Sequence, residues 1–188
     1  KENKDFNGTI SFIITGDEEA DSVNGVKKVV KWLKENNIRI DGSIATESSS
    51  EKIIGDQIKV GRKGAVDVQV EIIGKQGHAA YPQLAQNPLH CLSKVISFFD
   101  DQKLDDGAEY FEPSTLQFTQ INLNNKAKNV IPEKLITVGD MRFNDNWDQE
   151  KIQNYFDEHL TKICSENNCR YKLNLTFRGM PFQSFDNP

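Results

Sequence analysis

The sequence of 188 residues predicts two architectures in one chain: an α/β part over residues 1–61 and an α+β domain over residues 62–178. Three observations predict this division. Residues 9–14 form an almost continuous apolar run, which is the pattern of a parallel strand buried on both faces. From residue 64 onward, apolar residues alternate with polar ones, as in a strand with one solvated face. Strands and helices then follow in the order β-α-β-β-α-β, which is the ferredoxin-like order.

The N-terminal part is predicted to be a strand, a helix and a second strand. Val26, Val29, Val30 and Leu33 recur at helical spacing and predict a helix over about residues 22–36. A second buried strand is predicted at residues 43–46, which completes a parallel-type βαβ unit. We also expect a short strand element within residues 53–60, interrupted at Gly55.

The second domain begins with the alternating strand over residues 66–72. Asn87 and Pro88 are a cap and a first-turn proline, so they mark the start of a helix that reaches Phe99. The remaining elements are expected at residues 116–123 (a strand with a bulge near Thr119), 134–143 (strand), 152–163 (helix) and 171–177 (strand). The domain is predicted to be inserted into the α/β part, with boundaries near residues 61 and 179, so that residues 179–188 return to the α/β part.

Composition excludes several classes of function. A net charge of −5 and a pI near 5.3 argue against nucleic-acid binding. No apolar run approaches the roughly 18 residues of a membrane span, and three cysteines are too few, and odd in number, for a disulfide framework. We therefore expect a cytoplasmic protein with reduced thiols and no membrane or nucleic-acid partner. The polar start and the unfinished end indicate a piece of a longer protein.

Carboxylates follow both predicted buried strands. Glu18 and Glu19 come after the first strand, and Glu47 follows the second. The carboxyl ends of strands in open α/β sheets are where ligand sites are built. Consecutive carboxylates at such a position repel one another unless a cation or a shared proton neutralises them. The pattern therefore favours a metal site, and the alternative is an acidic first turn of a helix.

A second candidate site lies in the loop after the first alternating strand. His78 follows Gly77 and precedes Tyr81, and it belongs to no apolar periodicity. Glycine lets the backbone approach another group closely, and an imidazole can donate a hydrogen bond to a developing oxyanion. The alternative is a merely solvated loop histidine. His90 and His159 lie on the predicted helices, and we interpret them as structural.

Arginine and asparagine side chains in this domain indicate an anionic substrate. Arg142 lies in an alternating strand, Arg62 precedes the first strand, and Asn129 precedes a proline-containing turn. A guanidinium group is a planar fork that suits a carboxylate, and an amide offers both donor and acceptor. The alternative for each arginine is a solvated, outward-facing side chain.

These motifs together resemble a known family. Taken in order, they are similar to the succinyl-diaminopimelate desuccinylase branch of the co-catalytic zinc amidohydrolases, which also include aminoacylases and acetylornithine deacetylase. The resemblance covers essentially the whole chain. The motifs that carry it are Thr15-Gly-Asp-Glu-Glu19, Gly55-Asp-Gln-Ile-Lys-Val-Gly-Arg62-Lys-Gly64, Gly74-Lys-Gln-Gly-His-Ala-Ala-Tyr-Pro82 with Asn87-Pro-Leu-His90, Asn129-Val-Ile-Pro132 and Gly179-Met-Pro-Phe182.

The resemblance implies hydrolysis of N-succinyl-LL-2,6-diaminopimelate to succinate and LL-2,6-diaminopimelate, on the route to lysine and cell-wall precursors. It implies a cytoplasmic homodimer formed through the inserted domain, with two zinc ions, for which cobalt can substitute. By position, Glu18 resembles the general base, Glu19 and Glu47 resemble metal ligands, and His78 resembles the oxyanion donor that reaches into the partner subunit's site. The positions that match substrate contacts are Arg62, Tyr81, Asn129 and Arg142.

The chain departs from the family pattern at several positions. Ala65 stands where a serine is usual, Lys128 stands beside Asn129, and Thr46 and Ser48 flank Glu47. The family's remaining metal ligands are expected outside this sequence, so this piece alone should bind zinc weakly and be inactive. Two alternatives stay open: a related deacylase or aminopeptidase such as acetylornithine deacetylase, and a non-catalytic dimerisation module.

Overall fold

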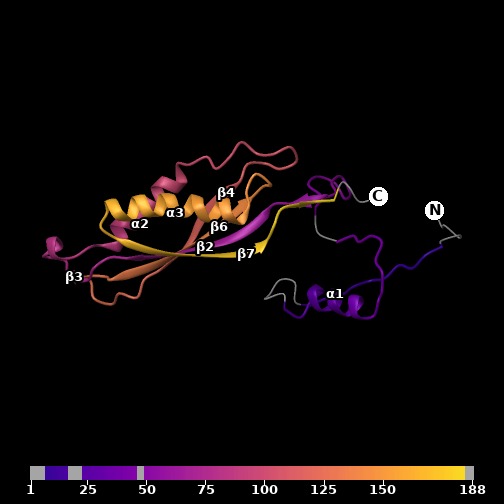
Figure 1. Cartoon of the computed structure of the whole chain (residues 1–188), viewed down its shortest axis with the longest axis horizontal. Coiled ribbons are helices and arrows are strands. Elements are labelled where there is room, and N and C mark those ends of the chain that lie inside the picture. Colours follow the sequence, from indigo (N-terminus) through magenta and orange to yellow (C-terminus); the bar gives the residue numbers. More distant parts are fainter. Residues whose placement is uncertain (1–6, 17–22, 46–48, 185–188) are drawn as a thin grey trace. The chain divides into compact units, whose positions relative to one another are not determined.

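The computed structural model describes residues 7–16, 23–45 and 49–184. Its contacts divide the chain into two compact units, residues 1–48 and 49–188 (Figure 1). The boundary predicted near residue 61 separates the inserted domain from the α/β part, and it stays a prediction.

The first unit contains helix α1 (Val26–Glu35), within the range predicted from apolar spacing. None of its residues is buried. The described residues 9–14 and 43–45 form no strand, and Phe12 and Ile14 are 87% and 94% exposed. The predicted βαβ unit is therefore not formed in the described residues. A parallel strand is held by hydrogen bonds to neighbouring strands and by elements that cover both of its faces, and here the apolar side chains are uncovered.

The second unit is built on a four-stranded sheet. Its elements are β2 (Gly64–Ile73), α2 (Pro88–Asp100), β4 (Thr115–Asn122), β6 (Lys134–Phe143), α3 (Gln149–Glu166) and β7 (Arg170–Gly179). The strands lie in the order β4-β6-β2-β7, and every neighbouring pair is antiparallel. The succession β-α-β-β-α-β is the one predicted. Both helices cover one face of the sheet (Figure 1).

The core lies between this sheet and its helices. Val66, Val68, Val70 and Ile72 on β2 are completely buried, and the residues between them face the other side. Fully burying each such side chain stabilises the fold by about 1.5–3 kcal/mol. From α2 and α3 the core receives Leu92, Val95, Phe99, Ile152, Phe156 and Leu160. We call the opposite surface, which neither α2 nor α3 covers, the open face of the sheet.

Local sequence signals place the helix ends and one irregularity. The Asn87 side chain accepts a hydrogen bond from the Leu89 N–H, and Pro88 occupies the first turn of α2, as predicted. Asp148 caps α3 in the same manner by accepting from the Lys151 N–H. The pairing of β4 with β6 shifts between Phe118 and Gln120, so the predicted bulge is confirmed.

Short elements extend both ends of the sheet. At one end, β1 (Gly61–Arg62) pairs with β8 (Phe182–Gln183), and at the other, β3 (Gly77–His78) pairs with β5 (Val130–Ile131). A 3₁₀ turn, η1 (Pro82–Leu84), follows β3. The strand element predicted within residues 53–60 is wrong. Residues 51–56 form a turn, because the Asp56 carboxylate accepts hydrogen bonds from three backbone N–H groups, those of Glu51, Lys52 and Ile53.

Two further observations concern the described part of the chain. Cys91, Cys164 and Cys169 are free thiols that meet in the core, with 3.7 Å between the Sγ atoms of Cys91 and Cys164. None of the helices in the described ranges has the length and apolar character needed to cross a membrane.

Candidate functional site

The predicted site residues fall into three sets. Glu18, Glu19 and Glu47 lie outside the described residues. His78, Tyr81 and Asn129 lie together beyond one end of the sheet, on and beside β3 and β5. Arg62 and Arg142 lie at the other end, on β1 and β6.

The His78 loop (residues 74–86) is held by backbone pairing on two sides. His78 pairs with Val130, and the Ala79 N–H donates to the Asn129 carbonyl at 2.9 Å. Lys75 and Gln86 exchange two backbone hydrogen bonds of 2.9 Å, which close the base of the loop. The Gln86 side chain then donates to the carbonyl of Asn167, at the end of α3. The loop is therefore shaped and anchored, unlike the solvated alternative.

Two glycines permit this packing. A Cβ on Gly74 would lie 2.1 Å from the Gln86 carbonyl oxygen, and one on Gly77 would lie 2.6 Å from the Ala85 Cβ. Real Cβ atoms do not approach other atoms so closely, so the loop closes only because both positions lack a side chain.

The hydrogen bonds of His78 determine which ring nitrogen can act as a donor. Its Nδ1 accepts from the Ala80 N–H at 3.1 Å, so in a neutral imidazole the proton lies on Nε2. The Asn129 side-chain amide lies 3.4 Å from Nε2, and rotating this amide presents its oxygen to that proton. The Tyr81 ring lies 5.8 Å from the imidazole ring. The loop thus presents an exposed N–H donor oriented by a neighbouring amide, which suits it to stabilise an oxyanion.

The end of the sheet that holds Arg62 and Arg142 carries an ion-pair network on the open face. The Asp140 carboxylate accepts from Nε of Arg142 at 2.6 Å and from Nη2 at 3.1 Å, and it also contacts Arg178. Arg178 in turn lies 3.1 Å from Asp67. Burial raises the pKa of Asp140, but the hydrogen bonds from Arg142 and Arg178 outweigh it and hold that pKa below its usual value. Arg142 is thus not the isolated solvated side chain of the alternative interpretation.

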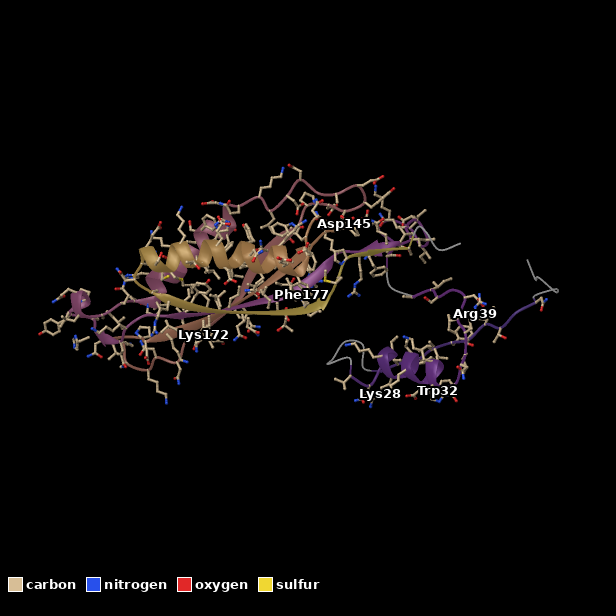
Figure 2. The ribbon with its side chains drawn as sticks, in the orientation of Figure 1. Lys28, Trp32, Arg39, Asp145, Lys172 and Phe177 are labelled. Atoms are coloured by element: carbon tan, nitrogen blue, oxygen red, sulfur yellow. The ribbon has the colours of Figure 1, made fainter. Side chains whose placement is uncertain are left out.

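Sequence reasoning missed Asp67, Asp140 and Arg178. The signal for Asp140 was present, since residues two apart on a strand share a face and Asp140 precedes Arg142 by two. Lys172 and Phe177, by the same rule, lie on opposite faces of β7 (Figure 2). Arg178 shares its face with Lys172 by the same rule, so its place on the strand was also visible in the alternation of β7.

The two described groups are far apart within one chain. Ala65 pairs with Arg142 near one end of β2, whereas Ile73 lies at the end that leads to His78. At about 3.4 Å per residue, these ends are separated by roughly 27 Å. One chain therefore does not bring His78 and Arg142 to the same small substrate.

Metal-ligating side chains do not gather in the described residues. Within the ranges that the structure describes, no group of three or more histidine, cysteine, aspartate and glutamate side chains could hold a metal ion. The carboxylates predicted as ligands, Glu19 and Glu47, fall outside those ranges.

Comparison with known proteins gives the class. Residues 60–168 match the model of the M20 peptidase dimerisation domain, and the chain belongs to this family. A tripeptidase from Staphylococcus aureus shares the fold, with a TM-score of 0.52 and 22% identity over 69% of this chain and 33% of that one.

Curated relatives are more specific. The succinyl-diaminopimelate desuccinylase of Orientia tsutsugamushi (strain Ikeda) is 39% identical over 180 residues, which cover 96% of this chain and 45% of that protein. The enzyme of the same name from Pelagibacter ubique (strain HTCC1062) is 38% identical, over 96% of this chain and 47% of that protein. The chain therefore spans about half the length of these relatives.

Proposed function

We propose that this chain is the dimerisation domain, with a neighbouring part of the catalytic domain, of a metal-dependent succinyl-diaminopimelate desuccinylase. In this proposal the dimerisation domain is the ferredoxin-like segment over residues 62–178, inserted into the catalytic domain. The observation that carries the proposal is the 39% identity to such an enzyme across 96% of the chain. The reaction adds water across the amide bond of N-succinyl-LL-2,6-diaminopimelate and yields succinate and LL-2,6-diaminopimelate.

The acidic residues after the predicted strands supply the proton chemistry. We assign Glu18 as the general base that takes a proton from the hydrolytic water, and Glu19 and Glu47 as ligands of two zinc ions whose other ligands lie outside this sequence. When bound, such ions polarise an amide carbonyl and lower the pKa of water. Glu18 adjoins the assigned ligand Glu19 in the sequence but is not itself assigned as a ligand. Its carboxylate can therefore accept a proton from the hydrolytic water.

The described residues bind and orient the substrate. Arg62 and Arg142 pair with substrate carboxylates, while Tyr81 and Asn129 line the approach to His78. His78 donates its Nε2–H to the oxygen on which negative charge develops. The roughly 27 Å between the His78 loop and Arg142 along the sheet supports an arrangement in which His78 acts in the site of a second subunit. The substrate is then held between two copies of the chain.

The second copy pairs with strand β4. Both β4 and β7 are edge strands, but β7 carries Arg170, Lys172 and Arg178, whereas β4 has no charged residue. Charged residues on an edge strand oppose strand addition, and an uncharged edge invites it. Beside β4 lies a depression of about 150 Å³, lined by Ile96, Phe99 and Phe118 among others. An edge strand and the helix next to it supply a continuous surface for a two-fold contact.

The test is hydrolysis by the complete protein that contains this chain. We expect turnover of the N-succinyl substrate, and we expect Glu18→Gln to abolish it while metal content stays near wild type, because glutamine cannot accept the proton. Glu19→Gln is the matched control and should lose metal. Metal analysis of both variants distinguishes the two roles: loss of metal in Glu18→Gln with retention in Glu19→Gln reverses the assignment. Hydrolysis of N-acetylornithine without hydrolysis of the succinyl substrate favours the related deacetylase instead.

A further inference from the structure

On the open face, arginine side chains lie beside two small residues, Ala65 and Gly179. Ala65 pairs with Gly179 of β7 on one side and with Arg142 of β6 on the other. The Arg62 guanidinium lies so close to Gly179 that a Cβ there would be 3.1 Å from Nη2. Ala65 and Gly179 project little or nothing from the sheet, so neighbouring side chains can pack directly over them, and Ala65 is only 4% exposed.

Arg178 lies near these residues, at a shift in the pairing of β7 with β2. Ala65 pairs with Gly179 and Val66 pairs with Phe177, so Arg178 has no partner opposite it on β2. The alternation along β7 places Arg178 on the same face as Thr176, which is the open face. There its Nε lies 3.1 Å from Asp67 and its guanidinium also contacts Asp140.

The carboxylates in this network leave an excess of positive charge. Asp67 and Asp140 are directly opposite one another on β2 and β6, a like-charge pair that is unfavourable unless cations neutralise it. Arg178 bridges both carboxylates, and Arg142 binds Asp140 with two nitrogens. With Arg62, three guanidinium groups face two carboxylates. This end of the face therefore retains one positive charge for an anion.

Arg142 and Arg178 both keep N–H groups that can donate hydrogen bonds to a ligand. A guanidinium has five N–H groups, and Arg142 and Arg178 each direct two nitrogens to carboxylates. Their side chains are 52% and 41% exposed, so the remaining N–H groups can meet a ligand from solvent. Asp140 fixes the planes of both groups, which lowers the entropy lost when a carboxylate binds.

We propose that Arg178 is a specificity-determining residue of the substrate carboxylate site, and that Asp140 is the positioning residue that aligns it with Arg142. This inference rests on the proposed function, in which Arg62 and Arg142 bind an N-succinyl substrate. Ala65 has no side-chain hydrogen-bond donor, and Arg178 supplies donors on the same side of the sheet. The N-succinyl substrate carries three carboxylates, one of which meets Arg178.

The first experiment compares Arg178→Gln with wild type in the complete protein. Glutamine removes the charge, so KM for the N-succinyl substrate should rise about 10- to 100-fold while kcat stays within about twofold. The matched control is Arg170→Gln, on the same strand and the same face but at its opposite end, which should leave KM unchanged. Asp140→Asn should raise KM as well, and Asp140→Glu should restore part of the loss.

A substrate analogue separates recognition from structure. Converting the carboxylate that binds Arg178 to an amide removes the partner of Arg178, so the Arg178→Gln penalty in KM should largely disappear for one of the three possible monoamides. An equal penalty for all three monoamides and the parent substrate, or a fall confined to kcat and melting temperature, would overturn the proposal and leave Arg178 with a structural role only.

A binding measurement decides the inference even if the reaction is misassigned. Absence of hydrolysis by the wild-type protein would refute the proposed function alone. Calorimetric titration with succinate then tests the arginine site directly. Binding to wild type and to Arg170→Gln that is weakened at least tenfold in Arg178→Gln supports the inference. Equal binding to all three, or binding to none, overturns it.

Discussion

Asp105 holds together the long connection between α2 and β4. Its Oδ1 accepts from the N–H groups of Gly107 (2.8 Å) and Ser114 (3.1 Å) and from the Asn144 side chain (2.7 Å). Its Oδ2 accepts from the Trp147 indole at 2.7 Å. Burial raises the pKa of Asp105, but these hydrogen bonds outweigh it and bring the pKa to about 2. The carboxylate thus joins the connection to the turn that precedes α3.

Asp105→Asn should destabilise the chain by about 2 kcal/mol at neutral pH. In either orientation of the asparagine amide, its NH₂ group faces an N–H group that donates a hydrogen bond to the carboxylate in the wild type. The carboxyl pKa is depressed in the folded state, from 3.8 to about 2, so its contribution is present above pH 4 and is lost as pH falls toward 2. Urea unfolding at several pH values should show the difference from wild type shrinking across that interval.

The neighbouring Asp106 provides the control. Its side chain is 88% exposed, and within the described residues its ion-pair partner is Lys103. Asp106→Asn should therefore change the unfolding free energy by less than about 0.5 kcal/mol. Equal losses in the two variants, or a loss in Asp105→Asn that does not depend on pH, would contradict the assigned role.

The sequence indicated candidate residues more readily than the residues that contact them. His78 is visible because it stands between glycines and outside any apolar pattern, and the structure confirms a shaped loop. Arg142 is visible as a cation in an alternating strand. Arg178 is equally visible on β7, but its ion pairs with Asp67 and Asp140 are not, because they depend on the pairing register of three strands. The separation of Arg142 from His78 is also a property of the sheet rather than of either motif.

At the scale of elements, the packing of the His78 loop depends on one pair of small residues. Gly77→Ala should displace the loop, since its Cβ would lie 2.6 Å from the Ala85 Cβ, whereas the next contacts are 3.5 and 3.8 Å. We expect shifted backbone amide NMR signals for residues 77–81 and at least a tenfold loss of hydrolysis in the complete protein, because an oxyanion donor acts only in the correct position.

The same contact supplies a compensating change. Removing the Ala85 methyl leaves only ordinary van der Waals distances around the new Cβ, so the double variant Gly77→Ala with Ala85→Gly should regain most of the lost activity and the wild-type signals. Ala85→Gly alone should behave nearly as wild type. A double variant as impaired as Gly77→Ala would show that the loop is not limited by this contact.

Strands whose hydrogen-bonded partner strands lie in the same unit were predicted well. The residues assigned to β6 match its predicted range, and those of β2, β4 and β7 differ by only one or two residues at each end, because each strand alternates against a core within the same unit. The two parallel-type strands predicted before residue 47 are not formed in the described residues. An apolar run predicts burial, but it becomes a strand only when neighbouring strands supply the hydrogen bonds.

At the scale of the whole molecule, strand β4 decides the association of two copies. The double variant Thr115→Lys with Ile121→Lys places charges on this edge at two exposed positions, so the monomer should remain folded. The dimer dissociation constant should rise at least tenfold, since each unfavourable cross-strand charge costs on the order of 1 kcal/mol. Sedimentation velocity over a concentration series measures this change, and Thr176→Lys on the already charged edge β7 should leave the dimer intact.

The same variants test whether one site needs two subunits. Because His78 and Arg142 are roughly 27 Å apart along one sheet, a monomer lacks either the oxyanion donor or the carboxylate anchor at any given substrate. The β4 variant of the complete protein should lose hydrolysis in proportion to its dissociation, and raising the protein concentration should restore specific activity as dimers re-form. A β4 variant that is monomeric by sedimentation yet fully active would show that His78 serves its own subunit. A dimer lost in Thr176→Lys but kept in the β4 variant would move the interface to β7.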